Sequence, residues 1–168
     1  MPNGYRCIKS ARPRSDKAEL TMVANHSGVY IFFRSRFTVH RISLPHHQLA
    51  EVLAVYVQGG GVNLIVIVIY RPGSRPVDSA FFREFATIVE WVASMVVVVG
   101  DVNIHLDDPT SPSTNNFNDI ILGCDLRQLV TRPTHEAGHT LVSGWIVSWQ
   151  CTITSSGCLQ HVSTSFAS

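Results

Sequence analysis

The sequence predicts a layered α/β domain with a mixed sheet, and three observations lead to that expectation. Runs rich in β-branched and aromatic residues are typical of strands, and an apolar repeat at helical spacing lies among them. Hydrophobic residues make up 45% and charged residues 15% of the 168 residues, which excludes a disordered chain and allows one domain with a core. The strand candidates are residues 28–33, 37–43, 51–58, 62–70 and 95–99.

The first four strand candidates precede the helical repeat. Arg34–Arg36 interrupts the run at 28–33, and the run at 37–43 alternates apolar with polar residues. Gly59-Gly60-Gly61 predicts a tight turn before residues 62–70, which are apolar on both faces. A strand of that kind is expected in the middle of a sheet that is covered on both sides.

The helical repeat begins after Arg71-Pro72-Gly73, which predicts the end of the preceding strand. Asp78 is a plausible N-cap for a helix that runs from Phe81 to Val92 with apolar residues on one side. Residues 95–99 then predict a fully buried strand that ends at Gly100. A short helix is expected at 116–122, with Gly123 as its stop signal.

Charge is distributed unevenly along the chain, although the formal net charge is only +1. No Asp, Glu, Lys or Arg occurs between Ala137 and Ser168. The N-terminal basic residues could attract a polyanion, but solvated surface is the favoured interpretation. These basic residues are Arg6, Lys9, Arg12, Arg14, Lys17, Arg34, Arg36 and Arg41.

The cysteines Cys7, Cys124, Cys151 and Cys158 form no CxxC pair, which argues against a zinc ribbon or a disulfide scaffold. No apolar run approaches the roughly 20 residues that span a bilayer, and the N-terminus lacks a signal-peptide core. We therefore expect a soluble protein without membrane contact, located in the cytoplasm or nucleus and not secreted.

The strongest local signal for chemistry is Gly100-Asp101-Val102-Asn103 at the end of a buried strand. Alternation should place Asp101 and Asn103 on one side while their apolar neighbours anchor the segment. A carboxylate can orient or deprotonate water, and an amide can stabilise charge on a phosphodiester. The alternative is that both residues merely cap the following turn.

The segment His135-Glu136-Ala137-Gly138-His139 matches the HExxH pattern of zinc proteases. That chemistry needs both histidines one turn apart on a helix, but Pro133 and Gly138 oppose a helix here. No Asp or Glu follows as a third ligand. A polar loop with two histidines is the favoured interpretation.

With these residues identified, the chain resembles the endonuclease domain of LINE-type (non-LTR) retrotransposons. Those domains belong to the exonuclease–endonuclease–phosphatase superfamily, which includes the apurinic/apyrimidinic endonucleases. The resemblance covers roughly residues 1–141 and rests on ordered segments. These are SGVYIFFRSRFTVHRISLP, IVIVIYRPGS, SAFFREFATIVE, VVVVGDVNIHLDDP, NNFNDIILGCDLRQLV and TRPTHEAGHTL.

The resemblance implies a four-layer α/β sandwich and a Mg²⁺- or Mn²⁺-dependent phosphodiesterase that nicks DNA to prime reverse transcription. It assigns water activation and metal contact to Asp101, phosphate and transition-state contacts to Asn103, and a phosphate contact to Tyr70. It places Arg71 and Thr140 on the substrate side. DNA and the parent element's reverse transcriptase in cis are the implied partners.

Several features of the family pattern have no counterpart in this sequence. The family's metal-binding Glu, the Asp of GHTLD and the Ser-Asp-His segment are missing, and Leu141 is followed by Val142. A single Asp with an Asn makes a poor Mg²⁺ site. We therefore expect a partial endonuclease domain at 1–141 and a diverged or out-of-frame tail at 142–168.

The first functional hypothesis is a retrotransposon endonuclease fragment with impaired DNA-nicking activity. The second is a non-catalytic retroelement remnant or binding module. An HExxH zinc metalloprotease is a distant third.

Overall fold

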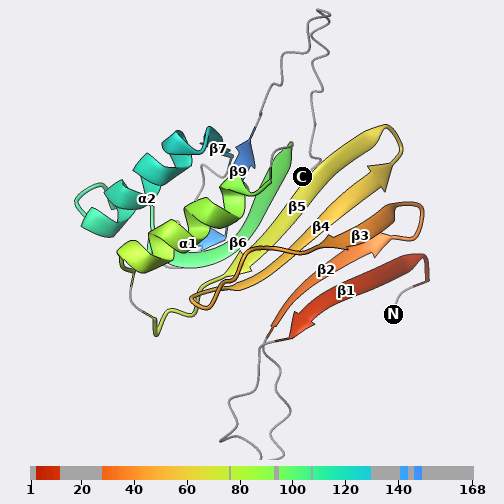
Figure 1. Cartoon of the computed structure of the whole chain (residues 1–168), viewed down its shortest axis with the longest axis horizontal. Helices are drawn as coiled ribbons and strands as arrows, with labels where there is room; N and C mark the ends of the chain where they lie inside the picture. The colour runs from red at the N-terminus through yellow and green to blue at the C-terminus, as the bar shows by residue number, and fades with distance from the viewer. Residues whose placement is uncertain are drawn as a thin grey trace, which may run out of the picture.

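The computed structural model describes residues 3–11, 28–75, 77–92, 95–106 and 108–129, and the backbone of 141–143 and 146–148. Figure 1 shows how the elements are arranged. They are β1 (Tyr5–Ala11), β2 (Gly28–Arg34), β3 (Thr38–Ile42), β4 (Glu51–Gly59), β5 (Val62–Tyr70), α1 (Ser79–Glu90), β6 (Val96–His105), α2 (Pro112–Gly123), β7 (Leu126–Gln128), β8 (Leu141–Ser143) and β9 (Ile146–Ser148).

The described strands form two sheets. A seven-stranded sheet has the order β3-β4-β5-β6-β9-β7, and β8 pairs with a different part of β6 from β9. Only β5 and β6 run parallel within this sheet, because α1 connects them as a crossover. The strands β1 and β2 form a separate antiparallel pair. The mixed sheet confirms the predicted α/β class.

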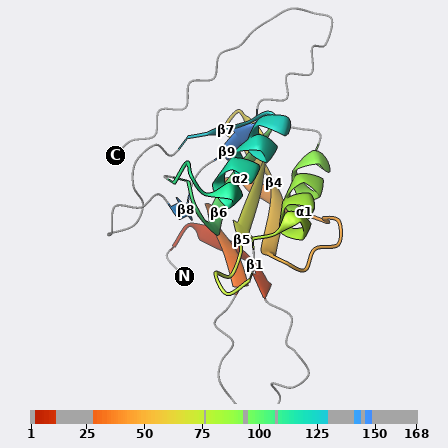
Figure 2. The ribbon, with the colours of Figure 1, turned by 90° about the vertical axis from the view of Figure 1, so that its left-hand side faces the viewer.

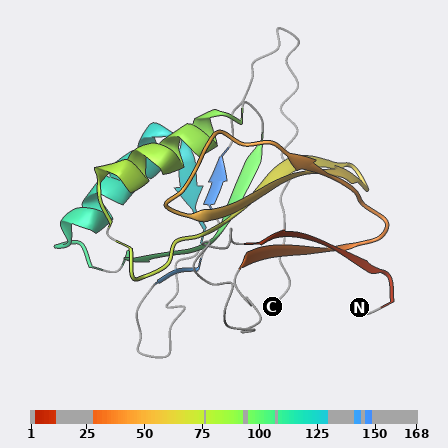
Figure 3. The same cartoon turned by 60° about the horizontal axis from the view of Figure 1, so that its bottom comes forward.

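The elements are stacked in layers. Figures 2 and 3 show α1 and α2 together on one face of the large sheet, and β1–β2 on the opposite face. The described residues thus form three layers, helices, large sheet and β1–β2 pair. This order agrees with an α/β sandwich.

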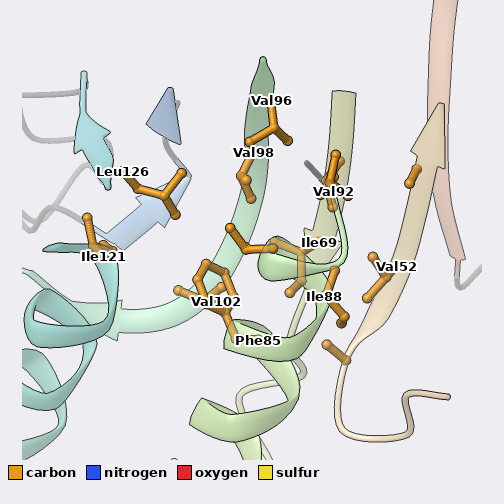
Figure 4. Packing of buried hydrophobic residues seen from close by; sticks show 14 of the residues in the cluster. Val52, Ile69, Phe85, Ile88, Val92, Val96, Val98, Val102, Ile121 and Leu126 are labelled. Atoms are coloured by element: carbon orange, nitrogen blue, oxygen red, sulfur yellow. The ribbon is translucent and has the colours of Figure 1, made fainter. Parts of the chain in front are cut away.

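The main core lies between the helices and the large sheet. Figure 4 shows Phe85 and Ile88 of α1 against strand residues such as Ile69 and Val98. The rings of Phe85 and Phe117 meet edge to face with centroids 5.1 Å apart, which joins α1 to α2. The apolar residues of α1 therefore pack against the sheet, as their helical spacing predicted.

A second, smaller core lies between the β1–β2 pair and the large sheet. Val29 of β2 packs with Leu53 and Val55 of β4, and half-buried residues of β5 join them. Strand β5 is therefore covered on both faces, as its two-sided apolar pattern predicted.

The local stop and start signals are also confirmed. Gly60 and Gly61 form the two-residue turn between β4 and β5, both with positive φ (61° and 79°). The Asp78 carboxylate caps α1 by accepting hydrogen bonds from the backbone N–H groups of Ala80 and Phe81, each at 3.0 Å.

Several predicted boundaries were wrong. Strand β6 continues through Gly100 to His105, and Met95 before it is 38% exposed rather than buried. The second helix begins at Pro112, four residues before the predicted start, since proline is well tolerated in the first helical turn. Strand β1 was not predicted, because its polar and charged residues mask the strand alternation.

Two short strands lie beyond residue 140. The β8 backbone pairs with β6, and β9 pairs with both β6 and β7. Strand β8 begins at Leu141, so the predicted boundary between domain and tail falls within it. None of the helices in the described ranges has the length and hydrophobicity to cross a bilayer.

A carboxylate of α1 holds the segment that leads into β4. Glu84 Oε2 accepts the N–H of Gln48 at 2.8 Å, and Oε1 accepts those of Leu49 at 2.9 Å and Ala50 at 3.2 Å. One side chain thereby satisfies three backbone donors that precede a buried strand.

We expect Glu84→Ala to lower the free energy of unfolding by about 1–3 kcal/mol, because these donors lose an ionised acceptor. Urea denaturation measures the change. Glu90→Ala, at an exposed position of the same helix, is the matched control and should change stability by less than about 0.5 kcal/mol. Equal effects of the two variants would contradict this anchoring role.

Candidate active site

The candidate site lies at the carboxyl end of β5, where its parallel pairing with β6 ends, four residues before β6 itself ends at His105. Tyr70 is in register with Asp101, and the Arg71 N–H extends the ladder by donating to the Asp101 carbonyl at 2.9 Å. Ligand sites of α/β sheets commonly form at such an edge.

The alternation predicted for β6 is confirmed. Val102 and Ile104 are 1% and 3% exposed and belong to the helix-side core, whereas Asp101 and Asn103 are half-buried. Their side chains therefore lie on the other face of the sheet, where Tyr70 packs against the second core. The structure thus brings Tyr70, Asp101 and Asn103 to one face.

The backbone between Gly100 and Asn103 departs from a regular strand. Gly100 has φ +140°, and a Cβ atom there would lie 1.7 Å from the carbonyl oxygen of Ile69. Asn103 has φ +52°, the left-handed region that asparagine tolerates better than most residues. The pairing of β6 with β8 shifts register between Asp101 and His105. This irregularity sets the direction of both polar side chains.

The Asp101 carboxylate has a local structural role. Its Oδ1 accepts the backbone N–H of Asn103 at 2.8 Å, a bond to the second residue on that supports the left-handed turn. Asp101 therefore does cap the following turn, as the alternative interpretation of this segment predicted. Within the described residues, this bond leaves the second carboxylate oxygen without a hydrogen bond.

The Asn103 side chain is held by the chain that follows β5. Its Nδ2 donates to the Arg71 carbonyl at 2.7 Å, which uses one of two amide hydrogens. A Cβ on Gly73 would meet Asn103 Oδ1 at 3.5 Å, so the loop after Pro72 lies close against this amide.

Arg71 is buried beneath the loop that follows β5 and donates hydrogen bonds to several backbone carbonyls. It is 2% exposed, and its Nε donates to the Val102 carbonyl at 2.6 Å and its Nη2 to the Asn103 carbonyl at 2.8 Å. Its Nη1 donates to the Pro72 carbonyl at 3.2 Å and to the Arg75 carbonyl. Four of its five N–H donors are thus used by backbone carbonyls.

The guanidinium of Arg71 also lies over the Phe81 ring, 5.6 Å from its centroid. Burial lowers the pKa of Arg71 from its ordinary value, while the charges of Asp101 and Tyr70 oppose that shift. This geometry favours a positioning role for Arg71 over the direct substrate contact implied by the family resemblance. The sequence alone could not show this role, because nothing around an Arg-Pro-Gly segment indicates burial.

Thr114, unlike Arg71, was not predicted from the sequence to lie near the site. It is 1% exposed, and its hydroxyl donates to the His105 carbonyl at 2.7 Å. This bond ties α2 to the far end of β6. A polar residue in a weakly amphipathic helix gives no signal of such a contact.

Thr140 and the HExxH segment lie outside the described residues. Leu141, the residue after Thr140, pairs with His105 through β8. The HExxH segment runs from His135 to His139. The roles of Thr140 and of the two histidines stay predictions.

The described part of the chain does not assemble a metal site. No group of three or more His, Cys, Asp or Glu residues able to hold an ion occurs there. Asp101 supplies the carboxylate nearest the candidate site, whereas Mg²⁺ prefers several oxygen ligands in octahedral geometry. These residues by themselves do not fit a magnesium ion.

Comparison with known proteins identifies the fold that carries this site. No protein-family model matches the sequence. No curated protein matches at a significant level. Solved structures, in contrast, do match, and 29 chains do so significantly. The chain has the α/β sandwich fold of endonuclease/exonuclease/phosphatase proteins.

One of these matches is the endonuclease domain of TRAS1, a telomere-specific non-LTR retrotransposon. Its TM-score is 0.58 at 10% identity, over 86% of this chain and 67% of that one. The fold expected from the sequence resemblance is thereby confirmed, since this neighbour is of the same kind.

Two further neighbours have other titles. The human Nocturnin catalytic domain with bound sulfate gives a TM-score of 0.55 at 15% identity, over 85% of this chain and 60% of that one. An endonuclease/exonuclease/phosphatase family protein from Leptotrichia buccalis C-1013-b gives 0.56 at 9% identity, over 89% and 62%. The chain thus spans 60–67% of the length of these three neighbours.

Proposed function

We propose that this chain is the partial endonuclease domain of a non-LTR retrotransposon, directed at the phosphodiester backbone of DNA. The observation that carries the proposal is the shared face of Tyr70, Asp101 and Asn103, where the parallel pairing of β5 and β6 ends. Likeness to a retrotransposon endonuclease fold supports it. The parent element would supply a reverse transcriptase in cis, and the nicked DNA would prime reverse transcription inside the cell.

The proposed chemistry follows from the groups at this edge. The Asp101 oxygen without a hydrogen bond orients and deprotonates a water that attacks phosphorus. The P–O bond to one sugar oxygen breaks as the new P–O bond forms, and the sugar oxygen leaves and takes a proton from solvent. The second amide hydrogen of Asn103 and the Tyr70 hydroxyl donate to the phosphate oxygens as charge develops. Thr140 is proposed on the substrate side. Arg71 keeps the Val102 and Asn103 carbonyls, and hence this edge, in place.

Dependence on Mg²⁺ or Mn²⁺ belongs to the proposal through the family resemblance. Asp101 is the proposed protein contact to the ion, and the described residues contain no cluster of ligands that could complete its coordination. We therefore propose slow turnover for this chain. The second candidate function, a non-catalytic remnant that only binds, is favoured by the same single carboxylate.

We expect slow nicking of supercoiled plasmid with Mg²⁺ or Mn²⁺, reduced at least about 100-fold by Asp101→Asn. Asparagine keeps an oxygen for the Asn103 N–H, so the turn should persist. Gel separation of supercoiled and nicked plasmid measures the rate. Asp119→Asn, at an exposed position of α2, is the matched control and should nick like the unaltered chain.

The other outcomes distinguish the two candidate functions. Nicking absent with either metal would reject the enzyme and favour the non-catalytic remnant. Nicking that survives Asp101→Asn would show that another site or a contaminant cleaves the plasmid.

A further inference from the structure

The last residue of β6, His105, lies on the same side of that strand as the candidate site. Val102 and Ile104 face the helix-side core, so alternation turns the residues on either side of them to the other face of the sheet. These residues are Asp101, Asn103 and His105. The face that presents Tyr70 and Asp101 therefore continues along β6 to an imidazole.

The irregular pairing of β6 with β8 shortens the distance between this imidazole and Asp101. Ser143 is opposite Asp101 and Leu141 is opposite His105, so β8 advances by two residues where β6 advances by four. Two residues of an extended strand span about 7 Å, whereas four would span about 13 Å. The bulge thus holds His105 and Asp101 closer together than a regular strand would.

A buried residue of α2 fixes the backbone from which the His105 ring projects. The Thr114 hydroxyl donates to the His105 carbonyl at 2.7 Å, and the Asp108 N–H donates to the same carbonyl at 3.2 Å. A hydroxyl as buried as that of Thr114 costs free energy unless it is hydrogen-bonded, so this contact is strongly favoured. The end of β6 is therefore tied to the helix layer at His105.

The loop between β6 and α2 is held by its own hydrogen bonds. Asp108 Oδ1 accepts the backbone N–H of Thr110 at 3.0 Å and its hydroxyl at 2.6 Å. The Asn115 side chain donates to the Pro109 carbonyl at 3.2 Å. His105 thus stands between a paired strand and an ordered turn, as a residue that must contact a ligand in one geometry requires.

We propose that His105 binds the DNA phosphate next to the one at the candidate site, with Thr114 as its positioning residue. This inference rests on the proposed function, which places the reacting phosphate at Tyr70, Asp101 and Asn103. A DNA strand carries one phosphate at every nucleotide, so a donor displaced along β6 meets the neighbouring phosphate. Imidazole keeps at least one N–H donor in either protonation state.

The role of such a contact is to fix the register of the DNA strand. Contacts to phosphates orient a protein on DNA without reading its sequence. One phosphate held at His105 would leave its neighbour to lie against Asp101 and Asn103. The contact requires no hydrolysis, so it can be measured by binding alone.

The first test is fluorescence anisotropy with the full chain and a short labelled DNA duplex, in EDTA so that no metal-dependent hydrolysis contributes. We expect His105→Ala to weaken binding about tenfold, since a hydrogen bond to a charged group is lost. His105→Gln should lose less, because glutamine keeps an N–H donor. His40→Ala is the matched control and should bind unchanged. His40 is an exposed strand histidine opposite Tyr56, which packs on the helix side of the same sheet.

Short phosphodiesters separate the neighbouring phosphate from the reacting one. A thymidine dinucleotide contains one phosphodiester and the trinucleotide contains two, and NMR titration in EDTA measures the affinity of each. We expect His105→Ala to weaken trinucleotide binding about fivefold and to leave dinucleotide binding unchanged. Tyr70→Phe should weaken both. Equal losses on the two ligands with His105→Ala would overturn the assignment, because the ring would then contact the same phosphate as Tyr70.

The positioning role of Thr114 has its own test. Thr114→Val removes the hydroxyl at nearly constant volume and should weaken duplex binding about threefold, whereas Thr114→Ser keeps the hydroxyl and should restore it. In a chain that already carries His105→Ala, Thr114→Val should have no further effect, because it acts through that ring. An equal loss in both backgrounds would overturn the positioning role.

The remaining outcomes distinguish this inference from the proposed function. Unchanged duplex binding by His105→Ala, or an equal loss with His40→Ala, would overturn the phosphate contact and leave plasmid nicking to be judged at Asp101. A chain that binds the duplex but never nicks it would reject the proposed hydrolysis and leave the His105 result intact. A chain that binds no duplex at all would overturn the inference.

Discussion

Replacing Gly100 by alanine is expected to destabilise the domain by more than about 4 kcal/mol, enough to unfold many domains of this size. The added Cβ would lie 1.7 Å from the Ile69 carbonyl oxygen and 2.7 Å from its carbon, both in the backbone of β5. Neither atom can move without opening the β5–β6 ladder. The φ of +140° at Gly100 adds strain for any L-residue with a side chain.

Circular dichroism and urea denaturation measure this loss. Gly123→Ala is the matched control, because a Cβ there meets nothing within 4 Å and the residue ends α2. It should leave stability unchanged or raise it by up to about 1 kcal/mol. A Gly100→Ala chain with normal cooperative unfolding would mean that β5 and β6 are not paired as described.

Replacing Arg71 by methionine is expected to cost about 3–5 kcal/mol. Methionine occupies a similar volume but leaves the carbonyls of Val102, Asn103, Pro72 and Arg75 without the donors that they have now. The guanidinium also bridges β6 to the loop after β5, which a neutral side chain cannot do. Any nicking activity should be lost together with the placement of Asn103.

Arg71→Lys separates charge from geometry, because lysine keeps the cation but cannot reach several carbonyls with a planar fork. It should recover only part of the lost stability. Arg83→Met, at an exposed position of α1, is the matched control and should change stability by less than about 0.5 kcal/mol. If Arg71→Met unfolds at the same urea concentration as the unaltered chain, the hydrogen bonds of the buried Arg71 side chain are not formed.

The parts of the fold that the sequence predicted are those with dense local signals. The hairpin of β4 and β5 has three consecutive glycines and two strong apolar runs, and α1 has an Asp cap followed by a clear helical repeat. Strand β1 lacked such a signal, since only alternate residues face the core and its outer face carries Tyr5 and Lys9. Its pairing with β2 bridges residues that are distant in the sequence.

The candidate site was predicted in part for the same reason. A buried strand that runs into Asp101 and Asn103 is visible in the sequence, and so is the Tyr70 position before Pro72. The continuation of β6 past Gly100 was not, because glycine after an apolar run ordinarily ends a strand. Here its missing Cβ instead allows β6 to lie against the Ile69 carbonyl.

The sequence by itself determined the α/β class, the central position of β5, the helix that covers it and the identity of the polar residues at the strand ends. These follow from periodicity, turn residues and caps, which act over a few positions of the chain. Tertiary structure alone decided that Arg71 is buried beneath the site and that Thr114 of α2 holds the His105 carbonyl at the end of β6. Both depend on which strands pair and which layer covers them, and packing between distant segments sets those relations.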